Sequence, residues 1–219
     1  MKPTTLSSHL AIAGLVFLPT EGFSESSPLV INPETSFAGR MFPTHENAIS
    51  GDYVFLDSAG EGTLTGTGQG SGYGVSLSTL RGNAYVSFVG KVRFSYHSGT
   101  SEKTVNEEAL SLPFRLFGGE ASIGARIHLL PGQTKGIRPY LGTAYVIGLQ
   151  HLRLSDLPES QTDLYTYSSG LVMGLDTFVG IDIKETLFAE FSLRGGSGSL
   201  GGFTTLSISS AVCSFGYRW

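Results

Sequence analysis

The chain has 219 residues, a formal net charge of −4, 15 % charged residues and a single cysteine. This length suits one domain, the charge gives no basic surface for nucleic acid, and one cysteine excludes an intramolecular disulfide. The 30 glycines and a mean hydropathy of only +0.10 are unusual for a soluble protein and for a helical membrane protein. They suit a membrane barrel, in which apolar and polar residues alternate along every strand.

Residues 1–24 predict a secretory signal peptide. Lys2 precedes an apolar run from Leu10 to Leu18, and the small residues Gly22 and Ser24 follow it around a cleavage point after Ser24. This is the layout of a signal peptide. The run is too short for a membrane anchor, because a spanning helix needs about 20 apolar residues. We therefore expect an exported protein.

Residues 25–69 have a poor pattern and leave two interpretations open. Ser, Gly and Thr accumulate from Ser58 to Gly72. The segment is therefore either a mobile extension or a weak first strand. The barrel itself is predicted to cover residues 70–219.

Five later segments alternate between large apolar and polar or small residues with a period of two, which indicates β-strands. They are residues 83–97, 119–130, 139–149, 171–182 and 187–194. Several run for about ten residues or more, the length that a tilted membrane-spanning strand needs. A porous barrel needs many more strands than this chain supplies. The predicted fold is all-β: a transmembrane antiparallel up-and-down β-barrel of eight strands, with ten as the alternative.

One segment inverts its own pattern. Leu110, Leu112, Phe114 and Leu116 alternate well, but the parity changes over 117–120, where two glycines stand side by side. A Gly-Gly hairpin would keep the apolar faces together, and a glycine bulge inside one long strand is the alternative. With a hairpin, eight strands begin near residue 70. With a bulge, residues 53–66 supply the first strand, and a hairpin plus earlier strands makes ten.

Connections between the predicted strands suggest the two sides of a membrane. Residues 130–136 and 183–186 are short and polar, as periplasmic turns are. The stretch 153–166 is longer and rich in Asp, Ser and Glu, which favours an external loop.

Turning the apolar faces toward lipid places charges of both signs in the lumen. The predicted polar network of the lumen consists of Lys91, Arg93, Arg115, Glu120, Arg126, Asp176, Asp182, Glu190 and Arg194. Such charges pair, because an unpaired buried charge is costly. The simplest interpretation is a satisfied polar core that plugs the lumen. The functional alternative is a gated conduit or ligand pocket.

The last seven residues, 213–219, alternate between an apolar and a polar face. Phe215, Tyr217 and Trp219 lie on the apolar face with Cys213, and the chain ends on an aromatic residue. This resembles the closing strand of bacterial outer-membrane barrels, and the run 139–142 is similar to a strand start in small OmpA/OmpX-type and Opa-type eight-stranded barrels. The resemblance implies that these three aromatics are an assembly signal.

The same resemblance implies a location in the bacterial outer membrane and a set of partners. These partners are outer-membrane lipid and lipopolysaccharide, the barrel-assembly machinery and possible surface ligands of the external loops. It also implies a monomer.

Enzymatic and metal chemistry find little support in the sequence. Some outer-membrane barrels hydrolyse lipids with a Ser and a His, for which His97 beside Ser98, and His151, are the candidates. Adjacent residues of a strand face opposite sides, so His97 and Ser98 form no pair. His128 is expected to be a hydrogen-bonded interior group. The five His lack metal-ligand spacing, so we expect no enzyme, metal or cofactor.

A structural or surface-interaction role, in adhesion or envelope integrity, is the first functional hypothesis. A narrow channel or transporter for a small solute is the alternative, and a lipid-modifying enzyme is the third. The facing of one strand gives a test: Val179→Arg, toward lipid, is expected to be strongly destabilising, and Gly180→Ser, toward the lumen, far milder.

Overall fold

The computed structural model describes residues 44–62, 65–105, 108–130, 136–155, 167–184, 186–200 and 203–219. The predicted signal peptide, residues 1–24, lies outside the described residues, as does the segment 25–43.

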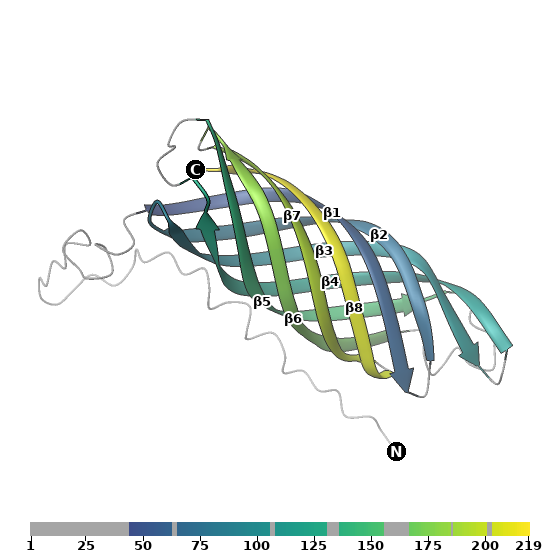
Figure 1. The fold of residues 1–219 in the computed structure, drawn as a ribbon. Coiled ribbons are helices and arrows are strands. Elements are labelled where there is room, and N and C mark those ends of the chain that lie inside the picture. Colours follow the sequence, from purple (N-terminus) through teal and green to yellow (C-terminus); the bar gives the residue numbers. More distant parts are fainter. Residues whose placement is uncertain are drawn as a thin grey trace, which may run out of the picture.

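Eight strands form a closed antiparallel barrel in chain order, with β8 returning to pair with β1 (Figure 1). The strands are β1 Thr44–Gly62, β2 Thr65–Gly82, β3 Val86–Val105, β4 Glu108–His128, β5 Ile137–Leu154, β6 Tyr167–Ile183, β7 Leu187–Leu200 and β8 Phe203–Arg218. Closure matters because a membrane-spanning backbone cannot leave polar groups unpaired in lipid. The prediction of an all-β, eight-stranded, up-and-down barrel is confirmed. No described helix is long and apolar enough to cross a membrane.

The barrel begins earlier than residue 70. The strand β1 lies within the segment 25–69 and pairs along its length with both β2 and β8, so that segment does contribute a first strand. Its alternation is hard to read because its buried positions mix Asp52 with Val54 and Leu56, while Gly51 takes one of the exposed positions.

The strand β4 runs straight through the two glycines. Its register is unbroken with β3 from Glu108 to Ile127 and with β5 from Phe114 to His128. The hairpin and the bulge predicted at Gly118–Gly119 are therefore both wrong, and so is the ten-strand alternative, but the single long strand that went with the bulge is present. A Cβ on Gly118 would lie 2.6 Å from Oε1 of Gln150, so the glycine makes room for an interior side chain. Even-numbered residues face inward along the whole of β4. The inner face changes from apolar, at Phe114 and Leu116, to charged, at Glu120 and Arg126.

The two ends of the barrel differ. At one end, here called the terminal end, β1 begins and β8 ends; the opposite end, here called the loop end, carries the longest connection, residues 155–166. The predicted turns 130–136 and 183–186 both lie at the terminal end. At the loop end the wall is uneven, because residues 108–113 of β4 pair with β3 but not with β5.

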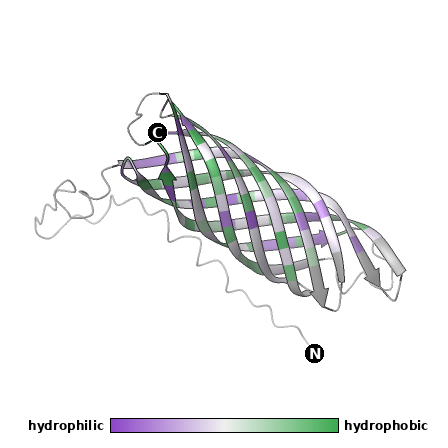
Figure 2. Ribbon diagram, viewed as in Figure 1, coloured by the Kyte–Doolittle hydropathy of each residue, from purple (hydrophilic) through white to green (hydrophobic). Residues whose placement is uncertain are grey.

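A belt of exposed apolar side chains surrounds the barrel. On β6 the outward-facing apolar residues run from Ile183, which is half-buried near the terminal end, to the exposed Leu171, a separation of 12 residues (183 − 171). At about 3.3 Å per residue and a tilt of about 45°, this covers about 28 Å along the membrane normal, close to the band of about 25 Å that a lipid-exposed barrel shows. Figure 2 shows hydrophobic residues alternating with other residues along the middle of the strands.

Beyond the belt, at the loop end, the inner and outer faces exchange character. The outer face there carries exposed polar or small residues, namely Asp57, Arg115, His151, Ser169, Ser197 and Ser209. The inner face carries an apolar cluster, here called the apolar cap, of Leu56, Phe114, Leu116, Leu154, Leu206 and Ile208. This is the pattern of a water-soluble barrel, with a polar surface over an apolar core. The membrane-spanning part has the reverse pattern.

Glycines inside the barrel make room for aromatic rings. A Cβ on Gly180 would lie 2.4 Å from Cζ and Oη of Tyr140, and a Cβ on Gly216 would lie 2.3 Å from the Phe188 ring. Real Cβ atoms do not approach so closely, so larger residues at these positions displace the ring. The expectation that Gly180→Ser is mild is therefore wrong, although Gly180 does point inward as predicted.

Candidate functional site

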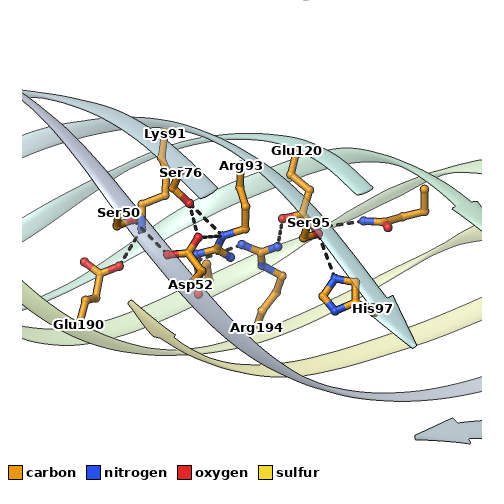
Figure 3. A network of polar contacts seen from close by, with 12 residues as sticks. Ser50, Asp52, Ser76, Lys91, Arg93, Ser95, His97, Glu120, Glu190 and Arg194 are labelled. Atoms are coloured by element: carbon orange, nitrogen blue, oxygen red, sulfur yellow. Dashed lines mark hydrogen bonds and ion pairs between the residues drawn. The ribbon is translucent and has the colours of Figure 1, made fainter. Parts of the chain in front are cut away.

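The centre of the lumen holds a buried ion pair between β1 and β3. Arg93 Nε donates a hydrogen bond to Asp52 Oδ2 over 2.8 Å, and both side chains are almost completely buried. The hydroxyl groups of Ser50 and Ser76 also donate to the Asp52 carboxylate. Figure 3 shows these residues converging from neighbouring strands. Asp52 thus has several donors, which is what keeps a buried carboxylate satisfied.

Three further ion pairs involve residues of β7, and two of them cross the lumen. Arg194 bonds to Glu120 of β4 and lies 3.3 Å from Asp176 of β6, and Glu190 lies 2.7 Å from Nζ of Lys91. The contacts of Arg194 with Glu120 and of Glu190 with Lys91 join non-adjacent strands and therefore cross the lumen, whereas Asp176 and Arg194 are direct partners on the neighbouring strands β6 and β7. Figure 3 shows Arg194 beside Glu120 in the same network.

A second cluster closes the terminal end around one carboxylate. Asp182 lies 2.6 Å from Arg218, 3.2 Å from Arg138 and 3.6 Å from Arg126. Glu46 lies 3.7 Å from Arg218 and 4.0 Å from Arg126. Arg218 of the last strand therefore connects β8 to the first strand and to β6.

Taken together, the charges of the central and terminal clusters balance, because the one extra anion of the central cluster is matched by one extra cation of the terminal cluster. The cations are Lys91, Arg93, Arg126, Arg138, Arg194 and Arg218, and the anions are Glu46, Asp52, Glu120, Asp176, Asp182 and Glu190. This balance of six against six gives the described network no net charge with which to select a cation or an anion.

Aromatic rings lie between the clusters. The guanidinium of Arg126 lies 4.7 Å from the centroid of Tyr140, and Nζ of Lys91 lies 5.8 Å from that of Phe178. Tyr140 also donates a hydrogen bond to Glu190 over 3.0 Å. Both cations thus lie within about 6 Å of an aromatic ring, the distance at which cation–π attraction is effective.

Little free space remains between the central network and the apolar cap. A cavity of about 30 Å³ is lined by residues of both, including His97, Gln150 and Leu116. This is room for about two water molecules, since one needs about 10–15 Å³. Side chains therefore fill most of the interior, with the terminal cluster around Asp182 at one end, the central network around Asp52 in the middle and the apolar cap at the loop end.

Eight of the nine predicted lumen residues lie on the inner face and take part in these ion pairs, and Arg115 does not. Arg115 is exposed on the outer face of β4. The prediction assumed that apolar faces turn toward lipid, but Phe114 and Leu116 lie beyond the belt and form part of the apolar cap. Arg115, between them, is therefore directed outward.

Four network residues were missed: Glu46, Asp52, Arg138 and Arg218. Glu46 and Asp52 lie in the segment whose pattern was poor. Arg138 and Arg218 could have been predicted from the alternation of their strands. Arg138 is two residues from Tyr140 and Arg218 is four residues from Ser214, so each faces the same side of its strand as that inward-facing residue.

The predicted Ser and His candidates separate into two cases. His97 is buried and lies 2.9 Å from Oγ of Ser95, which is on the same face, while Ser98 follows it on the opposite face. On the outer surface, however, Nδ1 of His151 lies 2.7 Å from Oγ of Ser169. These two exposed residues are direct partners on β5 and β6 and lie just past the belt.

His128 is buried at the terminal end, 4.0 Å from Asp182, in the interior position expected for it. Among the described residues, no three His, Cys, Asp or Glu side chains are grouped so that they could hold a metal ion.

Phe215, Tyr217 and Trp219 all lie exposed on the outer face near the terminal end. The rings of Tyr217 and Trp219 are stacked, with centroids 6.4 Å apart, and the Trp219 backbone exchanges two hydrogen bonds with Asn47. Their role as an assembly signal stays a prediction.

The closed wall, the apolar belt and the charge-paired lumen define a small eight-stranded membrane-spanning β-barrel. No protein-family model matches the chain, and no curated protein matches it.

Several solved outer-membrane proteins are similar in structure. Ail, the attachment invasion locus protein of Yersinia pestis, shares 12% identity over 80% of this chain and 99% of its own, with a TM-score of 0.47. Neisserial surface protein A shares 17% over 78% and 95%, with a TM-score of 0.44. OprG from Pseudomonas aeruginosa shares 12% over 80% and 96%, with a TM-score of 0.49.

Proposed function

We propose that this protein is a non-conducting surface protein of the outer membrane, with a role in surface interaction or envelope integrity. Its barrel is a rigid support that presents the loop end outside the cell. Outer-membrane lipid, lipopolysaccharide and the barrel-assembly machinery are its proposed partners, and it acts as a monomer.

The orientation follows from the two ends. The loop end carries the longest connection, residues 155–166, and external loops of outer-membrane barrels are longer than periplasmic turns. It is also the end where the wall continues past the apolar belt with a polar outer face and the apolar cap inside. A wall built in this way is stable in water, so we assign it to the external medium.

The filled interior is the observation that carries the non-conducting role. An ion crossing the lumen would have to displace the paired charges around Asp182 and Asp52 and then cross the apolar cap. Separating a buried ion pair leaves uncompensated charges, at a cost of about 3–5 kcal/mol. A hydrophobic constriction adds a second barrier, because it excludes water.

Conductance across a planar bilayer tests this role. The refolded protein is expected to give no stepwise current above the lipid baseline. A double variant, Phe114→Ala with Leu116→Ala, removes bulk from the apolar cap and shows whether the cap or the charged network closes the lumen. Steady unitary currents from the unmodified protein would contradict the proposal and favour the narrow channel.

One observation favours a second candidate function, lipid ester hydrolysis. The 2.7 Å contact between Ser169 Oγ and His151 Nδ1 places a nucleophile and a base within hydrogen-bond reach, on the outer surface just past the belt. Ser169 Oγ would attack an ester carbonyl while His151 takes its proton. The alcohol would then leave, and water would release the fatty acid from the serine. The backbone groups of both residues belong to the β5–β6 ladder, so the oxyanion would need side-chain donors.

Release of free fatty acid from lipopolysaccharide and from phospholipid vesicles tests this second function. Hydrolysis that Ser169→Ala abolishes, and that the matched change Ser197→Ala leaves intact, would establish it. Equal rates for the three proteins, at the level of protein-free vesicles, would exclude it.

A further inference from the structure

A hollow opens in the outer wall where β2, β1, β8 and β7 lie side by side. Its volume is about 640 Å³, within the range of about 300–1,000 Å³ that is usual for ligand sites. Phe55 of β1 and Leu193 of β7 form its two sides, and Ala211 of β8 lies between them as the direct cross-strand partner of both. The hollow thus exists because a small residue separates two large exposed ones.

One row further toward the loop end, the lining of the hollow becomes polar. The direct partners across β2, β1, β8 and β7 are there, in this order, Gln69, Asp57, Ser209 and Gly195. All four are exposed, and we call them the polar row. No hydrogen bond or ion pair between described residues engages the side chains of Asp57, Gln69 or Ser209. These three side chains are therefore available to a ligand.

The chemistry of the polar row suits hydroxyl groups and not phosphate. The carboxylate of Asp57 accepts hydrogen bonds, and the side chains of Gln69 and Ser209 both donate and accept them. Adjacent hydroxyls of a sugar ring also do both. Among the described residues that line the hollow, the only cation is Arg194, which bonds to Glu120 on the lumen side of the wall. A phosphate would therefore meet the negative charge of Asp57 without a cation to hold it.

Phe55 adds an aromatic ring beside the polar row. It is half-exposed, and its ring contacts that of Tyr53, with centroids 4.8 Å apart, while Tyr53 contacts Tyr73 over 5.2 Å. These contacts hold the ring in place, so a ligand that packs against it has little side-chain entropy to remove. The face of an aromatic ring is negative and attracts the weakly positive C–H groups on the face of a sugar ring.

The depth of the hollow favours a lipid as the carrier of that sugar. Phe55 and Leu193 are the last exposed large apolar side chains described on β1 and β7 toward the loop end, so the polar row lies where headgroups begin. A lipid with its sugar on the polar row has the start of its acyl chain between Phe55 and Leu193. A free sugar would leave this apolar part of the hollow unfilled.

We propose that the hollow binds the uncharged sugar headgroup of a glycolipid in the outer leaflet. The choice of leaflet rests on the proposed function, which places the loop end outside the cell, while the binding itself does not depend on it. Asp57, Gln69 and Ser209 bond to the sugar hydroxyls, and Phe55 packs against the ring.

An NMR titration of the folded protein in dodecylphosphocholine micelles, whose headgroup carries no sugar, tests this proposal. Dodecyl maltoside, added as a rising fraction of the micelles, is expected to shift the amide signals of Gly195 and Ser209 until they saturate. The double variant Asp57→Ala with Gln69→Ala should weaken this binding by about fivefold or more, because two hydrogen-bonding side chains are lost.

Two further variants complete the design. Ala211→Leu fills the hollow without changing the polar row and should also weaken the binding. The matched control is Ser98→Ala with Thr100→Ala, which removes two exposed polar side chains from the outer face of β3 and should bind as the unmodified protein does.

Three outcomes would overturn the proposal. Equal binding by the Asp57 and Gln69 double variant and by the control would show that the polar row is not the site. Equal shifts with a lysophospholipid in place of dodecyl maltoside would show that the hollow takes an acyl chain without recognising sugar. Equal shifts with maltose alone would show that it takes a free sugar. Because the assay uses micelles, none of these results depends on whether the barrel conducts.

Discussion

Placing a charge on the lipid-facing side of β6 tests the belt directly. Val179 is exposed on the outer face, between the exposed Leu171 and the half-buried Ile183, which mark the two edges of the belt. It lies two residues from the middle position, Thr177, a depth difference of about 5 Å at the tilt of about 45° expected for such strands. An arginine at the bilayer midplane costs about 2–4 kcal/mol, and less toward the interfaces. We therefore expect Val179→Arg to reduce the stability of the folded barrel in bilayers, measured as its free energy of unfolding, by about 2–3 kcal/mol.

Urea titration of folding into phospholipid vesicles measures this loss, and folding is followed by the mobility difference between boiled and unboiled samples on a gel. Ser197→Arg is the matched control, because Ser197 is exposed on the adjacent strand beyond the belt. It should change the free energy by less than about 1 kcal/mol, as expected near or outside an interface. Equal losses for the two variants would refute the position assigned to the belt.

Three other changes test the interior and the last strand. Arg93→Ala leaves Asp52 buried without its guanidinium partner and should destabilise the barrel by about 3–5 kcal/mol in the same urea titration. Gly180→Ala should cost about 1–3 kcal/mol by overpacking, and the same change should cost less in urea when it is made in a Tyr140→Leu background, because the Tyr140 ring is the obstacle. Trp219→Ala is expected to lower the folded fraction in the outer membrane, measured on gels of unboiled cell envelopes, and an unchanged fraction would show that Trp219 is dispensable for assembly.

The sequence predicted the membrane-spanning part of the barrel well, because there each strand faces two different solvents. Lipid outside and a polar lumen inside force a strict alternation, as in residues 171–182, where Leu175 and Val179 face outward and Asp176 and Asp182 inward. The long strands and the closing aromatic strand then pointed to a small closed barrel.

The same rule failed where the wall leaves the membrane. Around Phe114 and Leu116 the apolar residues lie inside and Arg115 lies outside, so a rule that turns apolar faces toward lipid inverts this part of β4. The two glycines at the transition looked like a hairpin or a bulge, although one of them makes space for Gln150. A period of two indicates that a strand is present, but which face is lipid-exposed depends on depth, which one sequence does not state.

The ion pairs themselves lay beyond prediction. Arg194 and Glu120 are 74 residues apart in the chain, and their contact depends on the closure of the barrel and on its register. The sequence indicated which charges share the lumen, and only the register shows which of them meet. The pair formed by Ser169 and His151 was hidden for the same reason, since it depends on the register between β5 and β6.

Cysteine labelling in intact cells tests the central claim, a barrel whose wall continues past the membrane at the loop end. In a Cys213→Ser background, Ser197→Cys and Thr177→Cys place thiols on the outer faces of neighbouring strands, beyond the belt and within it. We predict that a membrane-impermeant maleimide labels the cysteine at position 197 and not the one at 177, and that a cysteine at Thr186, at the terminal end, is labelled only after the outer membrane is permeabilised. Equal labelling at positions 197 and 177, or labelling at 186 alone in intact cells, would contradict the account.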